Sequence, residues 1–399
     1  MKKMLPLAIG AALLAATSSA FAITDEEGNA SLQFNFSAPG ARSLAMGGAF
    51  IGLADDATAA FSNPAGLVQL AAPEISMEYR SNDYTTEFVN GGSFSVDPFS
   101  NAGLTTAETE SDVSGVSYLS YVMPHEKWAV AVYRHEFLNF ETSFRTGLPT
   151  ATDADLAVLP FSANIDVSIV NYGLAGAFQA TDQLSLGMSI NSYELDLASS
   201  TQRFASINSS VVTFSTGQVG DDAGVGFSLG GQYRINDQWQ LGLVYRMAPE
   251  FKYTASLNSA TTSLDKTAYF NAPDTFGIGA VYRPSDALTL ALDVSQVFYS
   301  ELTDDMQSNF RSDATTSPEF QADVLDPLNI DDGVEVRLGA EYTLTELSTP
   351  FSIRAGIWRD PDHSIQYEGT PDSPFTDAYA NAVLFSSGKA QTHFSVGFG

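Results

Sequence analysis

Short segments in which apolar and polar residues alternate recur along the chain from residue 73 onward. In residues 184–190 every second residue is apolar, namely Leu184, Leu186, Met188 and Ile190; residues 239–247, 276–282, 288–294 and 334–342 repeat the pattern. A period of two is that of a β-strand, whose successive side chains point to opposite faces. Repeated segments of about ten residues with one apolar face are the sequence pattern of a transmembrane β-barrel.

The polar face of these segments carries charges, and the charges decide which way it points. A charged side chain on the lipid face would cost about 2–4 kcal/mol at the bilayer midplane. We therefore expect the polar face to line the inside, with Asp293, Glu335, Arg337, Glu341 and Arg354 among its members. The apolar face is expected to meet lipid, with Leu186, Leu241, Leu290 and Val336 among its members.

Tyrosines near the ends of the apolar faces support the membrane interpretation. A soluble β-sandwich would also alternate, but it would not explain these aromatic positions. They are typical of an aromatic girdle at one membrane interface and comprise Tyr233, Tyr245, Tyr282 and Tyr342.

The connections between the segments alternate between short and long. Short ones are expected near residues 124–127, 180–183, 235–238, 284–287 and 344–350, and most contain Asp or Asn, which favour turns. Long ones are expected near residues 90–111, 143–160, 200–221, 252–268, 301–330 and 359–389. Short periplasmic turns and long external loops define the topology of Gram-negative outer-membrane barrels. The sequence thus predicts an all-β, antiparallel transmembrane barrel with about twelve strands up to residue 399.

The first 22 residues have the pattern of a secretory signal peptide. Lys2 and Lys3 precede an apolar stretch from Leu5 to Ala16, and Ala20-Phe21-Ala22 is a small-x-small cleavage site. We therefore expect a mature chain that starts at Ile23 and is exported to the cell outer membrane. The chain has no cysteine, so neither a lipoprotein anchor nor a disulfide is predicted. No later stretch is long and apolar enough for a transmembrane helix.

The formal net charge of −29 excludes one class of partner. Nucleic-acid binding needs a basic surface, so no nucleic acid is expected. Two interpretations of the acidity stay open at this point. It favours solubility or life in a saline habitat, or it indicates acidic external loops that hold divalent cations beside lipopolysaccharide. Outer-membrane lipid and lipopolysaccharide are the expected surroundings, and the chain is expected to be a monomer.

The small-residue-rich stretch GARSLAMGGAFIGLADDATAAFSNPAGL, residues 40–67, stands ahead of the first strand. It contains the acidic pair Asp55-Asp56 and ends in Asn63-Pro64-Ala65. It resembles the N-terminal hatch of the FadL family of outer-membrane transporters for long-chain fatty acids and aromatic hydrocarbons, which includes the toluene porins. The resemblance implies a hatch, or plug, over residues 23–72 and a barrel over residues 73–399.

The resemblance also implies a fourteen-stranded barrel, so the last hairpin is expected to be missing and the sequence to be a fragment. A true twelve-stranded barrel is the alternative, since even strand numbers are allowed. Strand 3 of the family is kinked and opens sideways into the bilayer. Here residues 128–140 contain neither Gly nor Pro, so no such kink is predicted. A slip in the alternation of strand 4 predicts a bulge near Val170-Asn171.

Several residues are candidates for function within the expected hatch. Pro64 would fix a turn in which Asn63 satisfies backbone groups and Ala65 allows close approach to the wall; an ordinary helix–turn is the alternative. Asp55 and Asp56 are expected to pair with arginines of the lumen rather than to act as an acid/base pair. The candidate contacts for an apolar ligand are Phe34, Phe36, Phe50 and Phe61.

The motifs that would indicate catalysis are weak. Residues 226–230, GFSLG, match the GxSxG pattern of esterases, but they lie within an alternating strand and not at the strand–turn–helix elbow that the mechanism needs. The four histidines, His125, His135, His363 and His393, lack metal-ligand spacing. We expect no metal, no cofactor and no enzymatic activity. The expected function is passive transport of hydrophobic compounds through a plugged barrel. The alternative is a secretion-associated or structural barrel, because the sequence of residues 40–67 also resembles that of PorV-like relatives.

Overall fold

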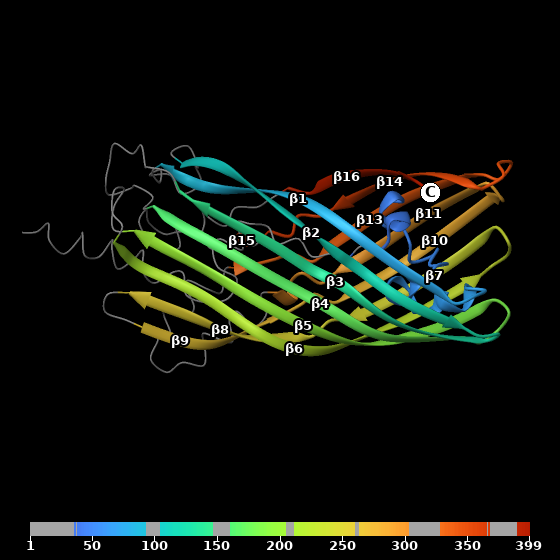
Figure 1. Ribbon diagram of the computed structural model, residues 1–399, viewed down its shortest axis with the longest axis horizontal. Coiled ribbons are helices and arrows are strands. Elements are labelled where there is room, and N and C mark those ends of the chain that lie inside the picture. The colour runs from blue at the N-terminus through green and yellow to red at the C-terminus, as the bar shows by residue number, and fades with distance from the viewer. Residues whose placement is uncertain are drawn as a thin grey trace, which may run out of the picture.

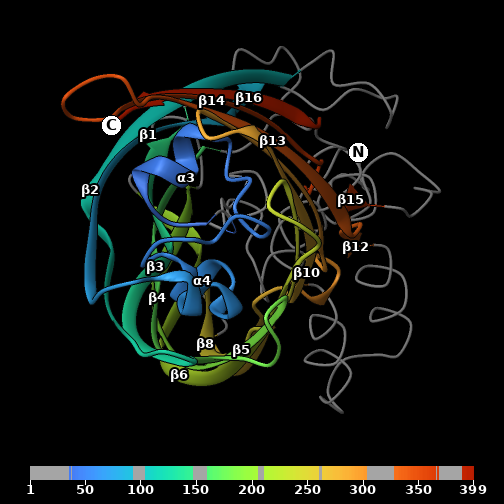
Figure 2. The same ribbon diagram turned by 90° about the vertical axis from the view of Figure 1, so that its right-hand side faces the viewer.

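The computed structural model describes residues 36, 38–92, 104–146, 160–204, 211–259, 263–302, 328–364, 366–367 and 389–399. The described chain is almost entirely antiparallel β-sheet, with three short helical turns near its start (Figure 1). The sheet curls around these turns, which lie inside it when the molecule is viewed end-on (Figure 2). None of the helices in the described part is long and apolar enough to cross a membrane.

The elements follow one another along the chain in a simple order. The helical turns are α3 (Ala41–Ala45), α4 (Ala59–Ser62) and the 3-10 helix η1 (Pro64–Gln69). The long strands are β1 (Glu74–Gly92), β2 (Leu104–Pro124), β3 (Trp128–Arg145), β4 (Phe161–Gln179), β5 (Leu184–Phe204) and β6 (Val212–Arg234). The shorter strands are β7 (Trp239–Met247), β8 (Glu250–Ser259), β9 (Ser263–Asn271), β10 (Thr275–Ser285), β11 (Leu288–Val297), β12 (Leu328–Asn329), β13 (Gly333–Leu344), β14 (Phe351–Asp360), β15 (Gln366–Tyr367) and β16 (Gln391–Phe398).

Neighbouring strands pair in sequence order, as in an up-and-down meander. The main path runs β1-β2-β3-β4-β5-β6-β7-β10-β11-β13-β14-β16, while β8 and β9 pair beside it and β12 pairs with β15. If β7 with β8, and β9 with β10, are each counted as one interrupted strand, the path has the twelve strands expected from the sequence. The five short connections lie at the expected places, between β2 and β3, β4 and β5, β6 and β7, β10 and β11, and β13 and β14.

The two faces of the sheet have the chemistry that the alternation predicts. Leu186, Leu241, Leu290 and Val336 are 38%, 42%, 39% and 37% exposed on the outer face. The charged residues Asp293, Glu335, Arg337 and Glu341 are buried inside. This inversion, with charges inside and leucines outside, is that of a membrane barrel and not of a soluble core.

The expected aromatic girdle needs one correction. Trp239, next to a short turn, stacks on Tyr282 with ring centroids 4.4 Å apart, and Tyr233 and Tyr342 also lie close to short turns. Tyr245 lies near the opposite end of β7, where it pairs with Phe276 of β10. It therefore does not belong to the same interface as the other three tyrosines.

The strands on one side of the molecule are longer than the alternation indicates. β1 to β6 have 18–23 residues, about twice the 9–11 that cross a bilayer. They extend into residues 90–111 and 200–221, and β8 and β9 form a hairpin within residues 252–268, although long loops are expected at all three places. The reason is physical. Outside the bilayer the outer face no longer has to be apolar, so the strands continue with their apolar residues on the inner face, as Leu195 and Leu197 of β5 do.

The irregularity expected in β4 lies on its neighbour. β4 pairs with β5 without a register shift, whereas the β3–β4 register shifts between Glu136 and Leu138 and leaves Phe137 as the extra residue. The bulge is therefore in β3, at Phe137, and not at Val170-Asn171. β4 itself alternates without interruption, and its apolar residues change from the inner face, at Ile165 to Ile169, to the outer face, at Tyr172 to Phe178.

β3 is irregular on its other side as well, contrary to the expectation of an uninterrupted strand. Its pairing with β2 ends at Tyr118 and His135, so the outer halves of β2 and β3 have no ladder between them in the described registers. Across this β2–β3 seam the Thr109 hydroxyl donates to the Ser143 carbonyl at 3.2 Å, and from β1 the Tyr84 hydroxyl reaches the Asn139 carbonyl of β3 at 3.4 Å.

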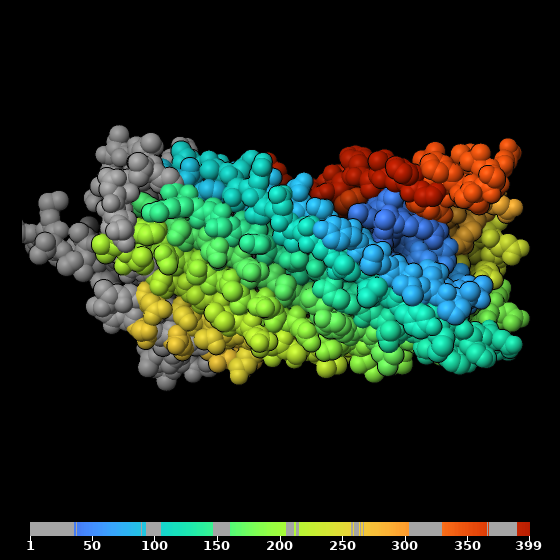
Figure 3. Space-filling model, in the orientation of Figure 1, coloured from blue at the N-terminus to red at the C-terminus, as the bar shows by residue number. Residues whose placement is uncertain are grey.

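β1 and β16 are the two ends of the path, and no register between them is found in the described residues. Part of the chain N-terminal to β1 is visible between them (Figure 3). A further hairpin beyond residue 399 stays a prediction.

Candidate functional site

The stretch that precedes β1, residues 38–73, is called here the N-terminal segment. It lies inside the curled sheet, toward the end of the molecule that carries the short turns (Figures 1 and 2). It is tied to both terminal strands. The N–H groups of Gly40 and Ala57 donate to the carboxylates of Glu78 and Glu74 on β1, at 3.2 and 3.0 Å. On β16, the Ser395 hydroxyl accepts from Gly47 N–H at 3.1 Å and donates to the Ala45 carbonyl at 3.0 Å.

Asn63 joins the N-terminal segment to itself and to the wall. Its side-chain oxygen accepts from Ala65 N–H at 3.2 Å and so caps η1, in which Pro64 occupies the first position. Its side-chain nitrogen donates to the carbonyls of Ile51 at 2.9 Å and of Gly231 on β6 at 3.2 Å. Asn63 is fully buried, so all three bonds are made away from water.

Glycines on seven strands receive the backbone of the N-terminal segment. A Cβ atom on any one of them would lie within 3.0 Å of Ala45–Gly47, Ile51–Gly52 or Asn63–Ala65, a separation that real Cβ atoms essentially never show. The wall must therefore lack side chains where the segment touches it. We call this set the glycine belt: Gly187, Gly230, Gly242, Gly279, Gly339, Gly356 and Gly397. The sequence shows many inward-facing glycines, but not which of them the N-terminal segment contacts.

One carboxylate anchors the middle of the N-terminal segment. Oδ2 of Asp293, on β11, accepts from the N–H groups of Phe50 at 2.6 Å and Ile51 at 2.7 Å. Gln240 and Gln232 donate to the carbonyl of Gly52 at 2.7 and 3.3 Å. The wall thus supplies both acceptors and donors to a stretch of backbone that has few partners of its own.

The acidic pair Asp55-Asp56 is surrounded by arginines. Arg42 of α3 contacts Asp55 at 2.5 Å and Asp56 at 3.4 Å, and Arg283 of β10 lies 3.7 Å from Asp55. Arg42 also bonds Glu341 of β13 at 2.9 Å, and Glu341 in turn bonds Arg354 of β14. This network of alternating charges links the N-terminal segment to three strands of the wall.

The network also keeps Arg42 charged. Burial by itself would lower the pKa of the guanidinium, but the charges and hydrogen bonds of Asp55 and Glu341 outweigh it and raise that pKa above its usual value. Every carboxylate of the network that contacts Arg42 is thereby satisfied as an ion-pair partner. None of them is placed as a free acid or base.

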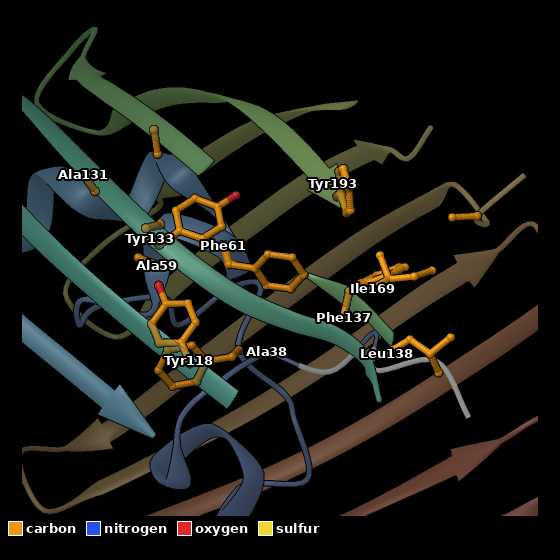
Figure 4. Close-up of a cluster of buried hydrophobic side chains, with 14 of the residues drawn as sticks. Ala38, Ala59, Phe61, Tyr118, Ala131, Tyr133, Phe137, Leu138, Ile169 and Tyr193 are labelled. Carbon is orange, nitrogen blue, oxygen red and sulfur yellow. The ribbon is translucent and has the colours of Figure 1, made fainter. Parts of the chain in front are cut away.

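A small, mainly apolar void lies next to Phe61 of α4. It is lined by Phe36, Phe61, Phe137, Tyr193, Arg246, Ala248, Pro273 and Thr275. Its cavity volume is only about 10 Å³, room for about one water. The bulge of β3 supplies Phe137, whose ring centroid is 5.4 Å from that of Phe36 and 5.7 Å from that of Tyr193 (Figure 4).

The candidate ligand contacts are only partly brought together. Phe36 and Phe61 line the void, whereas Phe50 is fully buried, with the Arg42 guanidinium 5.5 Å from its ring centroid, and does not line it. Phe34 lies outside the described residues. Phe137, Tyr193 and Arg246 also line the void but are not among the contacts expected from the sequence, because alternation predicts the face of a strand residue and not the residues it meets across the interior.

A larger polar cavity lies beside the void and shares Phe36 with it. Its volume is about 520 Å³. Its lining comes from strands at both ends of the path, with Tyr84, Leu138, Arg337 and Trp358 among the residues. Glu136 and Asn139 also line it. They lie on the half of β3 that does not pair with β2, so the cavity reaches the β2–β3 seam.

No catalytic arrangement is found in the described part of the chain. Ser228, of the GFSLG pentapeptide, lies in the middle of β6 and accepts a hydrogen bond from Asn191 at 3.4 Å. It is not on a strand–helix turn, so the esterase elbow is absent there. The described residues also contain no group of His, Asp and Glu that could hold a metal ion.

The model of the outer membrane protein transport protein family (OMPP1/FadL/TodX) matches residues 20–389. The chain belongs to the FadL/TodX family. No curated protein matches the sequence significantly.

Solved members of the FadL/TodX family share the fold. The Ralstonia pickettii toluene transporter TbuX is 17% identical over 81% of this chain and 86% of its own, with a TM-score of 0.52. The P. putida toluene transporter TodX is 17% identical over 81% and 83%, with a TM-score of 0.52. A Pseudomonas aeruginosa FadL homologue is 13% identical over 95% and 98%, with a TM-score of 0.51. Family membership makes this chain an outer-membrane transport protein of a family of transporters and not of enzymes.

Proposed function

We propose that this chain is a passive channel for hydrophobic compounds, either long-chain fatty acids or aromatic hydrocarbons, in the outer membrane. The observation that supports this best is the aromatic void between the N-terminal segment and the bulge of β3. The lining is mainly aromatic and apolar, and its one charged member, Arg246, donates to the carbonyls of Phe61 and Ser62, so the void favours apolar molecules. The toluene transporters TbuX and TodX point to the same class of ligand.

In this proposal residues 23–72 are the hatch and residues 73–399 the barrel, after a signal peptide of residues 1–22 has been removed. The hatch motif Asn63-Pro64-Ala65 fixes the hatch to the glycine belt. The pair Asp55-Asp56 holds Arg42, which in turn ties the hatch to Glu341 of the wall. A ligand enters the polar cavity, passes Phe36 to the void, and leaves sideways through the β2–β3 seam. The protein acts as a monomer surrounded by lipid and lipopolysaccharide.

The test is uptake of labelled toluene and labelled oleate by Gram-negative host cells that lack their own transporter. Asn63→Ala/Pro64→Ala removes the cap of η1 and the contact with Gly231, but no bond of the strand ladder. We expect a folded, heat-modifiable barrel whose uptake of the hydrophobic ligand is altered and whose leakage of small polar solutes rises. The matched control is Asn236→Ala, which removes the cap of a short turn, where Asn236 accepts from Gln238 and Trp239 at 2.9 Å.

Two outcomes would contradict the proposal. The first is that cells with the unaltered chain take up neither ligand faster than cells without it. The second is that the double variant transports the ligands and excludes small solutes just as the parent does. The first outcome would remove the transport function. The second would remove the role of the hatch motif.

A further inference from the structure

β6 is paired along its whole length on one side and interrupted on the other. It pairs with β5 in continuous register from Phe214 to Tyr233, and the register shifts only beyond Phe214, where Val212 pairs with Phe204. On its other side β7 pairs with Phe227–Arg234, and β8 pairs with Phe214–Val219. Residues 220–226 thus have no partner strand in the described registers on that side. We call this stretch the β6 seam.

Two prolines at matching positions cause the interruption. Ala248-Pro249 separates β7 from β8, and Ala272-Pro273-Asp274 separates β9 from β10. Proline has no N–H group to give to a ladder, so both strands break here. The two breaks are held together, because Ala272 N–H donates to the Pro249 carbonyl at 3.1 Å and Ala248 N–H donates to Asp274 at 2.9 Å.

The wall along the β6 seam is thin. Gly220, Gly224 and Gly226 have no side chains to fill it, and a Cβ atom on Gly224 would lie within 3.0 Å of the Pro249 ring. Pro249 therefore rests directly on the backbone of β6. A hydrogen bond from Lys252 N–H to the Asp222 carboxylate, at 2.7 Å, crosses the seam farther along.

Apolar surface lies on both sides of this thin wall. Inside, Ala248 and Pro273, the residues at the two breaks, line the aromatic void, and Tyr193 of the void would contact a Cβ atom on Gly226. Outside, Val225 is 67% exposed on the outer face of β6. The void is thus separated from the outer surface by a proline ring and a glycine backbone.

We propose that the β6 seam is a second lateral opening, through which an apolar ligand passes between the void and the surroundings of the barrel. The β8–β9 hairpin is its lid, because it is joined to β7 and β10 through the two proline breaks and pairs with β6 only at Phe214–Val219 (Figure 1). Movement of the hairpin about these breaks lifts Pro249 from Gly224. This inference rests on the proposed transport function, and it differs from the β2–β3 seam in strands and in residues.

Disulfide locks test the proposal, since the chain has no cysteine of its own. Val219→Cys/Thr254→Cys ties the lid to β6 next to the seam, since these exposed residues are the last directly opposed pair of the β6–β8 ladder. Gln218→Cys/Ala255→Cys is a second lock beside it, because these two buried residues are directly opposed in the same ladder. The matched control is Asn164→Cys/Ser200→Cys, a pair of directly opposed, exposed residues in the continuous β4–β5 ladder. Thr109→Cys/Ser143→Cys locks the β2–β3 seam for comparison.

Uptake of labelled toluene is measured with each lock oxidised and then reduced, with thiol titration to show that the bond has formed. We expect either β6 lock to lower uptake several-fold and the reductant to restore it, while the control pair changes nothing. Unchanged uptake with a fully formed β6 lock overturns the second opening, as does complete loss of uptake with the Thr109–Ser143 lock alone. If the reduced proteins take up no toluene at all, the transport function itself fails, and the second opening falls with it.

Discussion

Asp293 of β11 accepts a hydrogen bond from the main-chain N–H of Ile51 at 2.7 Å and is only 1% exposed. The same oxygen accepts from Phe50, so one side chain of the wall satisfies two donors of the N-terminal segment. Leaving a buried donor without a partner costs about 1–3 kcal/mol. Asp293→Ala is therefore expected to loosen the segment, with faster limited proteolysis between residues 38 and 73 while the barrel stays heat-modifiable. Asp293→Asn keeps an acceptor oxygen, so its rate of proteolysis should lie between those of the parent and of Asp293→Ala. Equal rates for all three proteins would contradict the role of Asp293 as an anchor.

The glycine belt makes a prediction about size alone. In Gly230→Ala the new methyl group would overlap Asn63, and overpacking of this kind costs about 1–3 kcal/mol. We expect the variant to displace the N-terminal segment and to leak small solutes. Gly115→Ala on β2 is the control, because a Cβ atom there meets nothing within 4 Å. A leak of equal size in both variants would show that the effect comes from the strands and not from the docking of the segment.

The aromatic void should respond to a change in its volume. Phe137→Ala removes the ring that the β3 bulge places in the void, and an enlarged apolar cavity binds small apolar molecules. We expect tighter binding and altered uptake of toluene. The free energy of unfolding should fall by at most about 3–5 kcal/mol. Phe144→Ala is the matched control: its ring packs on Phe88 and Phe161 in a separate cluster. If both variants change toluene binding alike, the void is not the binding place.

The outer halves of the long strands carry carboxylates that face each other directly. The opposed pairs, all exposed, are Asp83 with Asp112, Glu87 with Glu108, Glu141 with Asp166, and Asp196 with Asp221. Like charges directly opposite each other destabilise a sheet, and salt screens them. We expect added NaCl to raise the urea concentration at which the protein unfolds, and Glu87→Gln/Asp196→Asn to reduce that salt effect. An unfolding midpoint that does not move with salt would contradict this.

The sequence predicts the part of the fold that lies in the membrane. There one face of each strand must be apolar, so Leu186, Leu241, Leu290 and Val336 identify the outer face and the charged residues identify the inner one. The short turns are also predictable, because Asn236 and its neighbours have turn chemistry. The same argument fails beyond the bilayer, where the outer face of the β8–β9 hairpin and of the outer halves of β1 to β6 no longer has to be apolar.

The candidate site is predictable in its residue types but not in its partners. Asn63 is identifiable from its motif, yet its bond to Gly231 joins residues 168 positions apart. Phe137 gave no signal, because a bulge changes the face of a residue without changing the residue itself. Asp293 looked like any other inward charge of the lumen, and only the fold shows that it holds Phe50 and Ile51.

The glycine belt also sets an order of events during assembly. Its members come from strands spread between Gly187 and Gly397, so the surface that receives the N-terminal segment does not exist until those strands are aligned. Contacts this distant in sequence form slowly, because the loops between them must close first. The part of the chain that is synthesised first is therefore the last to find its place, and it must remain without a docking surface until the barrel around it has been built.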